Sequence, residues 1–316
     1  HASDGTPYAN LAETGERIAE AASDTGIGLT LLPVFYRFGG FGGADPNPGQ
    51  RRFLNDPDRF ARLVEASRAA IAPLPDATIG IAPHSLRAVD PPTLAAVLAA
   101  HPTGPVHIHV AEQTKEVEDC VAWSGQRPVA WLMDHADIDR RWCLVHATHM
   151  TSAETTRFAR SGAVAGLCPL TESSLGDGIF AGKDFLAAGG AFGIGTDSQI
   201  EISVAGELKQ LEYSQRLLHR SRNVLALGDG RSTGRTLYEL AAHGGAQVFD
   251  WYGVADPGPI AAEAADRDGM YVMEDAQYLE LVDETDGNVI ETTDRPGDMV
   301  VTSLYRDDIY PLIRFN

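Results

Sequence analysis

Lysine is scarce in this sequence, and so is positive charge in general. Only three lysines (Lys115, Lys183 and Lys209) stand among the 25 basic residues, against 44 aspartates and glutamates. The formal net charge is therefore −19, and the isoelectric point is about 4.8. A surface this negative repels the phosphate backbone of nucleic acids. Nucleic acid is therefore not expected as a partner.

Cysteine pairs and long apolar runs are also missing. The three cysteines form no CxxC motif, and their odd number argues against a disulfide framework, which favours a reducing compartment. No apolar run reaches the roughly 18 residues that a membrane-spanning helix needs. The chain begins at His1 without the pattern of a signal peptide. Together these absences predict a cytoplasmic protein with no membrane partner.

The chain also lacks a glycine-rich GxGxxG motif after any expected strand, which disfavours a doubly wound dinucleotide-binding sheet. A length of 316 residues fits about two domains or one large α/β barrel. Near-continuous apolar runs alternate with amphipathic stretches as far as residue 247, a pattern typical of parallel strands buried on both faces. Six such units predict most of a (β/α)8 barrel. The expected strands are 29–35, 78–82, 105–110, 142–146, 163–168 and 191–196, and the expected helices are 11–25, 58–72, 92–100, 114–134, 152–161, 185–188, 204–219 and 236–247.

The pattern changes after residue 247. The runs 270–274, 278–282 and 299–304 alternate polar and apolar residues, as exposed antiparallel strands do. Residues 286–288 and 295–298 supply turn signals between them. We therefore predict two domains: a barrel-type α/β domain over 1–247 and a small β-rich segment over 248–316.

Histidines and carboxylates stand where several of the expected strands end. The strand period of two places His107 and His109 on one face, and Glu112 follows that strand. His146 ends the next strand, and Asp197 ends the last one. One such histidine could simply be a strand-end residue, but the whole set suits a divalent metal that activates water. Cys143 and Cys168 are expected to be core residues.

These stretches resemble the metal-dependent amidohydrolase superfamily and, within it, the N-formimino-L-glutamate deiminase family. The resemblance covers residues 1–247. Thr171-Glu172-Ser173-Ser174 departs from the family pattern, in which Thr-Glu-Ala-Asn is expected. The matching segments are 31–36, 40–43, 49–53, 84–89, 106–113, 123–125, 141–149, 162–168, 175–180 and 193–198.

The resemblance also implies which strands are present. The family carries a metal-binding His-x-His pair on the first barrel strand, but Asp197, expected on the eighth, comes only 88 residues after His109. Seven further units of at least about 25 residues cannot fit in that interval. His109 is therefore placed on strand five, and the chain is expected to hold strands three to eight, with the first two strands and two metal ligands upstream. The open edges would need the tail or a second copy of the chain as cover, so a homodimer is one expected form.

The resemblance further implies roles for single residues. His109 and Asp197 would be two ligands of one zinc ion, and Asp197 would also accept a proton from the attacking water. Glu112 would carry protons to the departing nitrogen, and His146 would polarise the developing oxygen. The small-molecule substrate would be held by three residues: Arg87 would grip its carboxylate, and Tyr36 and His84 would contact it. The implied reaction is hydrolysis of N-formimino-L-glutamate to N-formyl-L-glutamate and ammonia, in histidine degradation.

Residues 248–316 resemble a different family, the adenylate-forming acyl-CoA ligases of the phenylacetate–CoA ligase type. The similarity lies in residues 248–256, 269–275, 299–304 and 311–316. It implies that Tyr252 stacks on adenine and that Asp256 lies near magnesium. Two alternatives to the deiminase therefore stay open: an adenylate-forming ligase and an inactive fusion of two fragments.

Overall fold

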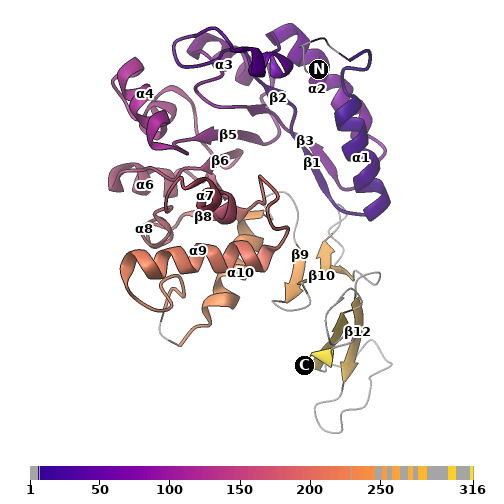
Figure 1. Cartoon of the computed structure of the whole chain (residues 1–316). Helices are drawn as coiled ribbons and strands as arrows, with labels where there is room; N and C mark the ends of the chain where they lie inside the picture. Colours follow the sequence, from indigo (N-terminus) through magenta and orange to yellow (C-terminus); the bar gives the residue numbers. More distant parts are fainter. Residues whose placement is uncertain are drawn as a thin grey trace. The chain divides into compact units, whose positions relative to one another are not determined.

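The computed structural model describes residues 6, 8–228 and 230–245 with their side chains. Beyond these it describes the backbone of the strands 251–254, 258–263, 270–272, 277–282, 298–303 and 314–315. The chain divides into two compact units, His1–Val248 and Phe249–Asn316. Figure 1 follows the chain through its helices and strands.

The first unit is built on a row of parallel strands. β1 (Leu29–Leu31) pairs with β3 (Ala77–Ile79), and β2 (Val34–Phe35) pairs with β4 (Ala82–Pro83). Backbone hydrogen bonds continue across both breaks, so each expected strand, 29–35 and 78–82, runs on as one ladder. Single parallel bridges from Ile81 to Val106 and from Ser85 to His109 join this ladder to the next strand.

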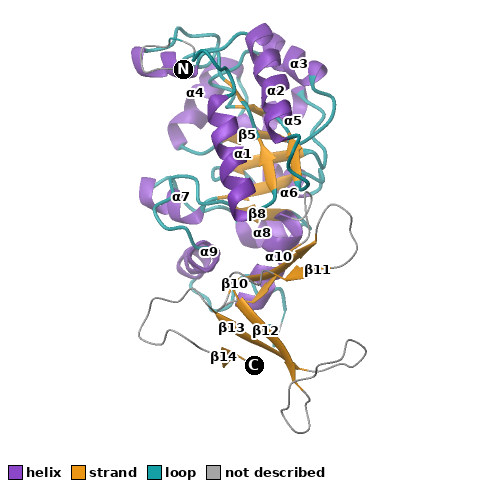
Figure 2. Cartoon of the chain, turned by 90° about the vertical axis from the view of Figure 1, so that its right-hand side faces the viewer, coloured by secondary structure: helices purple, strands orange, loops and turns teal. Residues whose placement is uncertain are grey.

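Four further strands complete the row in chain order. Each pairs in parallel with the next, as expected for strands that are linked through helices. Figure 2 shows them as neighbouring orange arrows with helices around them. They are β5 (Val106–Val110), β6 (Trp142–His146), β7 (Val164–Leu167) and β8 (Ala191–Ile194).

The helices begin at residues that the sequence marks as caps. Asp56 accepts a hydrogen bond from the N–H of Arg59 at the start of α2, and Thr151 and Glu154 form a capping box at α6. The helices are α1 (Glu13–Thr25), α2 (Pro57–Ile71), α3 (Pro91–Ala100), α4 (Thr114–Ser124), α5 (Pro128–His135), α6 (Ser152–Ala159), α7 (Pro169–Leu175), α8 (Gly182–Ala187), α9 (Val204–His219) and α10 (Thr233–Gly245), with a 3-10 helix at Pro48–Phe53.

One expected helix was wrong in extent, and another was missed. The stretch 114–134 forms two helices rather than one, because Gly125 takes a left-handed φ of 77° and Pro128 starts α5. The prediction contained no helix after β7, where the structure has α7. Its start was readable from Pro169 at the first helical position and Glu172 in the first turn.

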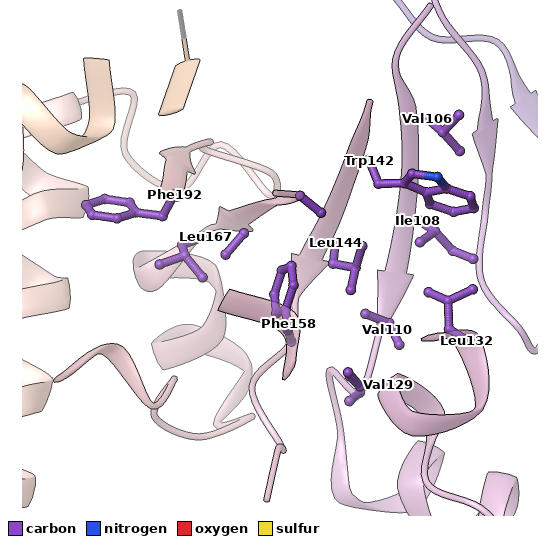
Figure 3. Close-up of a cluster of buried hydrophobic side chains, with 14 of the residues drawn as sticks. Val106, Ile108, Val110, Val129, Leu132, Trp142, Leu144, Phe158, Leu167 and Phe192 are labelled. Carbon is purple, nitrogen blue, oxygen red and sulfur yellow. The ribbon is translucent and has the colours of Figure 1, made fainter. Parts of the chain in front are cut away.

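The two faces of β5 differ in burial. Val106, Ile108 and Val110 are buried, whereas His107 and His109 between them are only partly buried. Figure 3 shows Ile108 and Val110 beside Leu132 and Val129 of α5, with Val106 next to Trp142 of β6. Because successive side chains of a strand point to opposite faces, the two histidines lie on the face away from these helices.

Helix α10 packs closely against β8. An added Cβ at Gly244 would lie 1.9 Å from the carbonyl oxygen of Phe192, which leaves space for glycine alone. Leu237 and Ala241 of the same helix are buried in the core. The end of the first unit is thus fixed to its last strand.

The second unit contains antiparallel strands, as its alternating pattern predicts. One sheet has the order β11 (Met270–Val272), β10 (Gly258–Glu263), β9 (Trp251–Val254), and the other has the order β12 (Gln277–Val282), β13 (Asp298–Ser303), β14 (Arg314–Phe315). The expected turn at 286–288 and most of that at 295–298 lie outside the described residues. So do the side chain of Tyr252 and all of Asp256. Within the described part of the chain, the helices are too short or too polar to cross a membrane.

Candidate active site

His109 lies on β5 with one ring nitrogen already occupied. Its Nδ1 is 2.8 Å from the backbone oxygen of His84, and the ring stacks on the His84 ring at 4.8 Å. Burial is the largest effect on this imidazole and lowers its pKa, which favours the neutral form. The neutral ring therefore donates through Nδ1 and leaves Nε2 as a free electron pair, the arrangement of a metal-binding histidine.

His146 ends β6 in a strained conformation, with a φ of 65°. Its side chain is 1% exposed, and its Nδ1 lies 3.3 Å from Oε1 of Glu172. Its Nε2 lies 3.7 Å from Oε1 of Glu112 and 3.9 Å from Oδ2 of Asp197, with no hydrogen-bond partner in the described structure. Two predicted site carboxylates thus converge on one imidazole nitrogen.

The charge of His146 follows from this setting. Burial acts most strongly and on its own would lower the pKa of the imidazole. The hydrogen bond to Glu172 and the charges of Glu112, Glu172 and Asp197 outweigh burial, so the pKa of His146 is raised. A protonated imidazole here can donate from Nε2 to a developing negative charge.

Glu112 is held by a second glutamate that sequence reasoning missed. Ala111 takes a left-handed φ of 51° after β5. The backbone N–H groups of Ala111 and Glu112 then donate to the two carboxylate oxygens of Glu116, at 3.1 and 3.0 Å. Burial raises the pKa of Glu116, and the nearby Arg87 opposes this shift. The Glu116 carboxylate therefore sets the direction in which Glu112 leaves the strand.

Asp197 is fixed by a threonine of α7. Asp197 has a φ of 39° and a half-exposed side chain. The buried Thr171 donates from Oγ1 to the carbonyl of Thr196 and accepts from the N–H of Ser198. The two hydrogen bonds hold the backbone of the residues directly before and after Asp197.

Helix α7 thus positions two site residues. Glu172 accepts from the N–H of Cys168 at 3.0 Å and also meets His146. Glu207 of α9 accepts from the N–H of Leu170 at 2.8 Å and ties the start of α7 to the body of the unit. Glu172 and Thr171 both lie in the segment where the sequence departs from the family pattern, and both keep the family's residue types.

The three predicted substrate-binding residues also lie together. Tyr36 packs edge-on against His84 at 4.7 Å, and its hydroxyl accepts from Gln50 at 2.8 Å. Burial, followed by the neighbouring His109 and Arg87, lowers the pKa of His84 to about 3. Arg87 lies 3.5 Å from Glu112. Its Nη2 also lies 3.9 Å from Oε2 of Glu116, and its buried Nε–H has no partner in the described structure.

The donor set fits a divalent metal ion. Donor atoms of His146, Cys168 and Asp197 lie within 4.8 Å of one another, and the His109 ring lies 5.6 Å from that of His146. Imidazole, carboxylate and thiol are ligands that suit zinc. Cys168 is buried, as expected of a core residue, but it also borders this cluster. Burial raises the pKa of its thiol, which keeps the sulfur protonated unless a metal is bound.

Comparison with known proteins identifies the family of this chain. A model of the amidohydrolase family matches residues 4–254. The chain is 56% identical to a formimidoylglutamate deiminase of Pseudomonas aeruginosa. The aligned region of 252 residues covers 79% of this chain and 55% of the deiminase. Neither match supports the ligase resemblance of residues 248–316, which stays a prediction.

Solved structures agree on the fold. The crystal structure of an amidohydrolase from Brucella melitensis superimposes with a TM-score of 0.79 at 51% identity, over 86% of this chain and 67% of that one. A zinc-bound adenosine deaminase from Xanthomonas campestris, at 20% identity, shares the fold with a TM-score of 0.63, over 92% of this chain and 56% of that one. The chain spans about half the length of this curated deiminase. The chain belongs to the amidohydrolase family.

Proposed function

We propose that this chain carries the substrate-binding and proton-transferring part of an N-formimino-L-glutamate deiminase. The reaction adds water across the C=N bond of the formimino group, breaks the C–N bond and releases ammonia and N-formyl-L-glutamate. The observation that carries the proposal is the convergence of Glu112 and Asp197 on Nε2 of His146. The 56% identity to a formimidoylglutamate deiminase supports this substrate.

The parallel row corresponds, in this proposal, to strands three to eight of a (β/α)8 barrel. Its strand order follows the chain, as in such barrels. The candidate residues lie at or just beyond the carboxyl ends of β5, β6 and β8, where barrel enzymes place their chemistry. This placement also supports His109 on strand five and Asp197 on strand eight.

The metal of this site is proposed to be zinc, held in part by His109 and Asp197. The free Nε2 of His109 and the position of Asp197 beside His146 fit that role. When bound, zinc supplies Lewis acidity that makes water a nucleophile near neutral pH.

Three side chains of this chain move protons in the proposal. Asp197 accepts a proton from the attacking water. Glu112 delivers protons to the departing nitrogen, so that ammonia leaves. His146 donates from Nε2 to the oxygen that develops on the attacked carbon, and Glu172 holds the imidazole in that orientation.

The glutamate part of the substrate lies, in this proposal, against Arg87, Tyr36 and His84. The buried Nε–H of Arg87 supports an ion pair with a carboxylate, because a guanidinium binds carboxylates through several donors at once. His84, neutral at physiological pH, adds a hydrogen bond rather than a charge.

Ammonia release tests the proposal. The full-length, zinc-loaded gene product is expected to release one ammonia per N-formimino-L-glutamate consumed and to form N-formyl-L-glutamate, measured by a coupled ammonia assay and mass spectrometry. 5-Methylthioadenosine serves as the comparison substrate, because more distant relatives carry the name of its deaminase. Turnover of the nucleoside in preference to the formimino compound would contradict the proposal.

A further inference from the structure

A turn that follows α7 places one more acidic side chain beside the candidate site. Gly176 and Gly178 take φ values of 74° and 141°, conformations that favour glycine, and they flank Asp177. An added Cβ at Gly178 would lie 3.2 Å from side-chain atoms of Thr148 and His149, which follow β6. His149 also lies 2.7 Å through Nε2 from the carbonyl oxygen of Asp177. The backbone of Asp177 is therefore fixed from both sides.

The Asp177 carboxylate is buried without enough donors. The residue is 9% exposed, and its Oδ2 has no hydrogen-bond partner in the described part of the chain. The Gln113 side chain acts on the carboxylate and lowers the pKa of Asp177, which opposes the effect of burial. A buried carboxylate oxygen that accepts no hydrogen bond is unfavourable, so such an atom calls for a donor from a bound molecule.

The surroundings of Asp177 indicate where that donor would stand. The backbone N–H of Asp177 donates to the carbonyl of Glu172 at 2.9 Å, and the Glu172 side chain meets His146 at the candidate site. Burial acts first, and the charge of Glu112 acts next, to raise the pKa of Asp177. A cationic ligand in this space would offset the repulsion between the two carboxylates.

We propose that Asp177 is a substrate-contacting specificity residue that accepts an N–H from the positively charged amidine group of the substrate. The proposal rests on the proposed function. Asp177 forms and breaks no covalent bond in it, because water adds to the amidine carbon and ammonia leaves through the groups already described.

The chemistry of substrate and product predicts that Asp177 prefers the substrate to the product. A protonated formimino group offers N–H donors and a positive charge, whereas the formyl group of the product has a carbonyl oxygen in place of one nitrogen. An ionised carboxylate accepts hydrogen bonds but donates none. It therefore attracts the substrate and repels the product oxygen, which favours both recognition and product release.

The test is Asp177→Asn, which keeps the size of the side chain but removes its charge and adds an N–H donor. The Michaelis constant for N-formimino-L-glutamate is expected to rise by about 10- to 100-fold, as for loss of a hydrogen bond to a charged group. The inhibition constant of N-formyl-L-glutamate is expected to fall, because the new amide can donate to the formyl oxygen. Both constants are measured on the full-length, zinc-loaded protein.

Asp184→Asn, an exposed change on α8, is the matched control and should leave both constants unchanged. If Asp177 only supported the fold, its replacement would weaken substrate and product alike and lower the melting temperature. That result, or unchanged constants, would overturn the inference. Failure of the unmodified protein to hydrolyse N-formimino-L-glutamate would instead overturn the proposed function, so the two failures are separable.

Discussion

Replacing Glu112 with Gln is expected to reduce kcat/KM for N-formimino-L-glutamate by about 10²- to 10⁴-fold, the range for loss of a general acid or base. The carboxylate lies 3.7 Å from Nε2 of His146, the proposed donor to the developing oxygen, and 3.5 Å from Arg87, the proposed partner of the substrate carboxylate. Glutamine keeps the shape of the side chain but cannot carry a proton to the leaving nitrogen. The measurement is the initial rate of ammonia release at low substrate concentration.

Glu118→Gln is the control for this change. Glu118 lies on α4, as Glu116 does, but its side chain is exposed. Its replacement removes the same charge without touching the site, and the rate should stay within about twofold, since surface substitutions have small effects. A Glu112→Gln protein that retained the unmodified rate would remove Glu112 from the mechanism.

Replacing Gly244 with Ala is expected to cost about 2–3 kcal/mol in the free energy of unfolding, an overpacking effect at the high end of its usual range. The added Cβ would lie 1.9 Å from the carbonyl oxygen of Phe192 and 2.4 Å from its carbon. Backbone atoms cannot swing aside as a side chain can, so α10 would have to move away from β8. Urea unfolding followed by circular dichroism measures the loss.

Gly234→Ala provides a matched control on the same helix. Position 234 has no atom within 4 Å of an added Cβ. Alanine favours a helix over glycine by about 1 kcal/mol, so this substitution should raise stability slightly. Equal effects at 234 and 244 would show that close packing between α10 and β8 does not limit stability.

The parallel strands and most helices were predictable because their signals are local. Apolar runs of strand length mark β5 to β8, and caps such as Asp56 and Thr151 mark helix starts. The prediction of one helix over 114–134 was wrong because the apolar periodicity hid Gly125, whose left-handed conformation ends α4. A single glycine inside an amphipathic pattern decides such a boundary only once the packing on both sides is known.

The sequence predicted the residues that gather at the candidate site, but not the residues that hold them in place. His109 and His146 lie in the last residues of β5 and β6, and Glu112 and Asp197 follow β5 and β8, positions that a sequence shows. Glu116 and Glu172 were missed because they act by accepting hydrogen bonds from backbone N–H groups of Ala111 and Cys168. Only the folded chain brings these N–H groups to the two carboxylates. The left-handed φ values of Ala111, His146 and Asp197 were also not predictable, because none of these residues is a glycine, the usual signal of that conformation.

A crystal structure of the zinc-soaked protein, with anomalous diffraction at the zinc edge, tests the central claim most directly. We expect a single strong peak in contact with both Nε2 of His109 and the carboxylate of Asp197, with His146 and Glu112 beside it. A peak bound elsewhere, or His109 and Asp197 turned away from each other, would contradict a hydrolytic metal site at these strand ends.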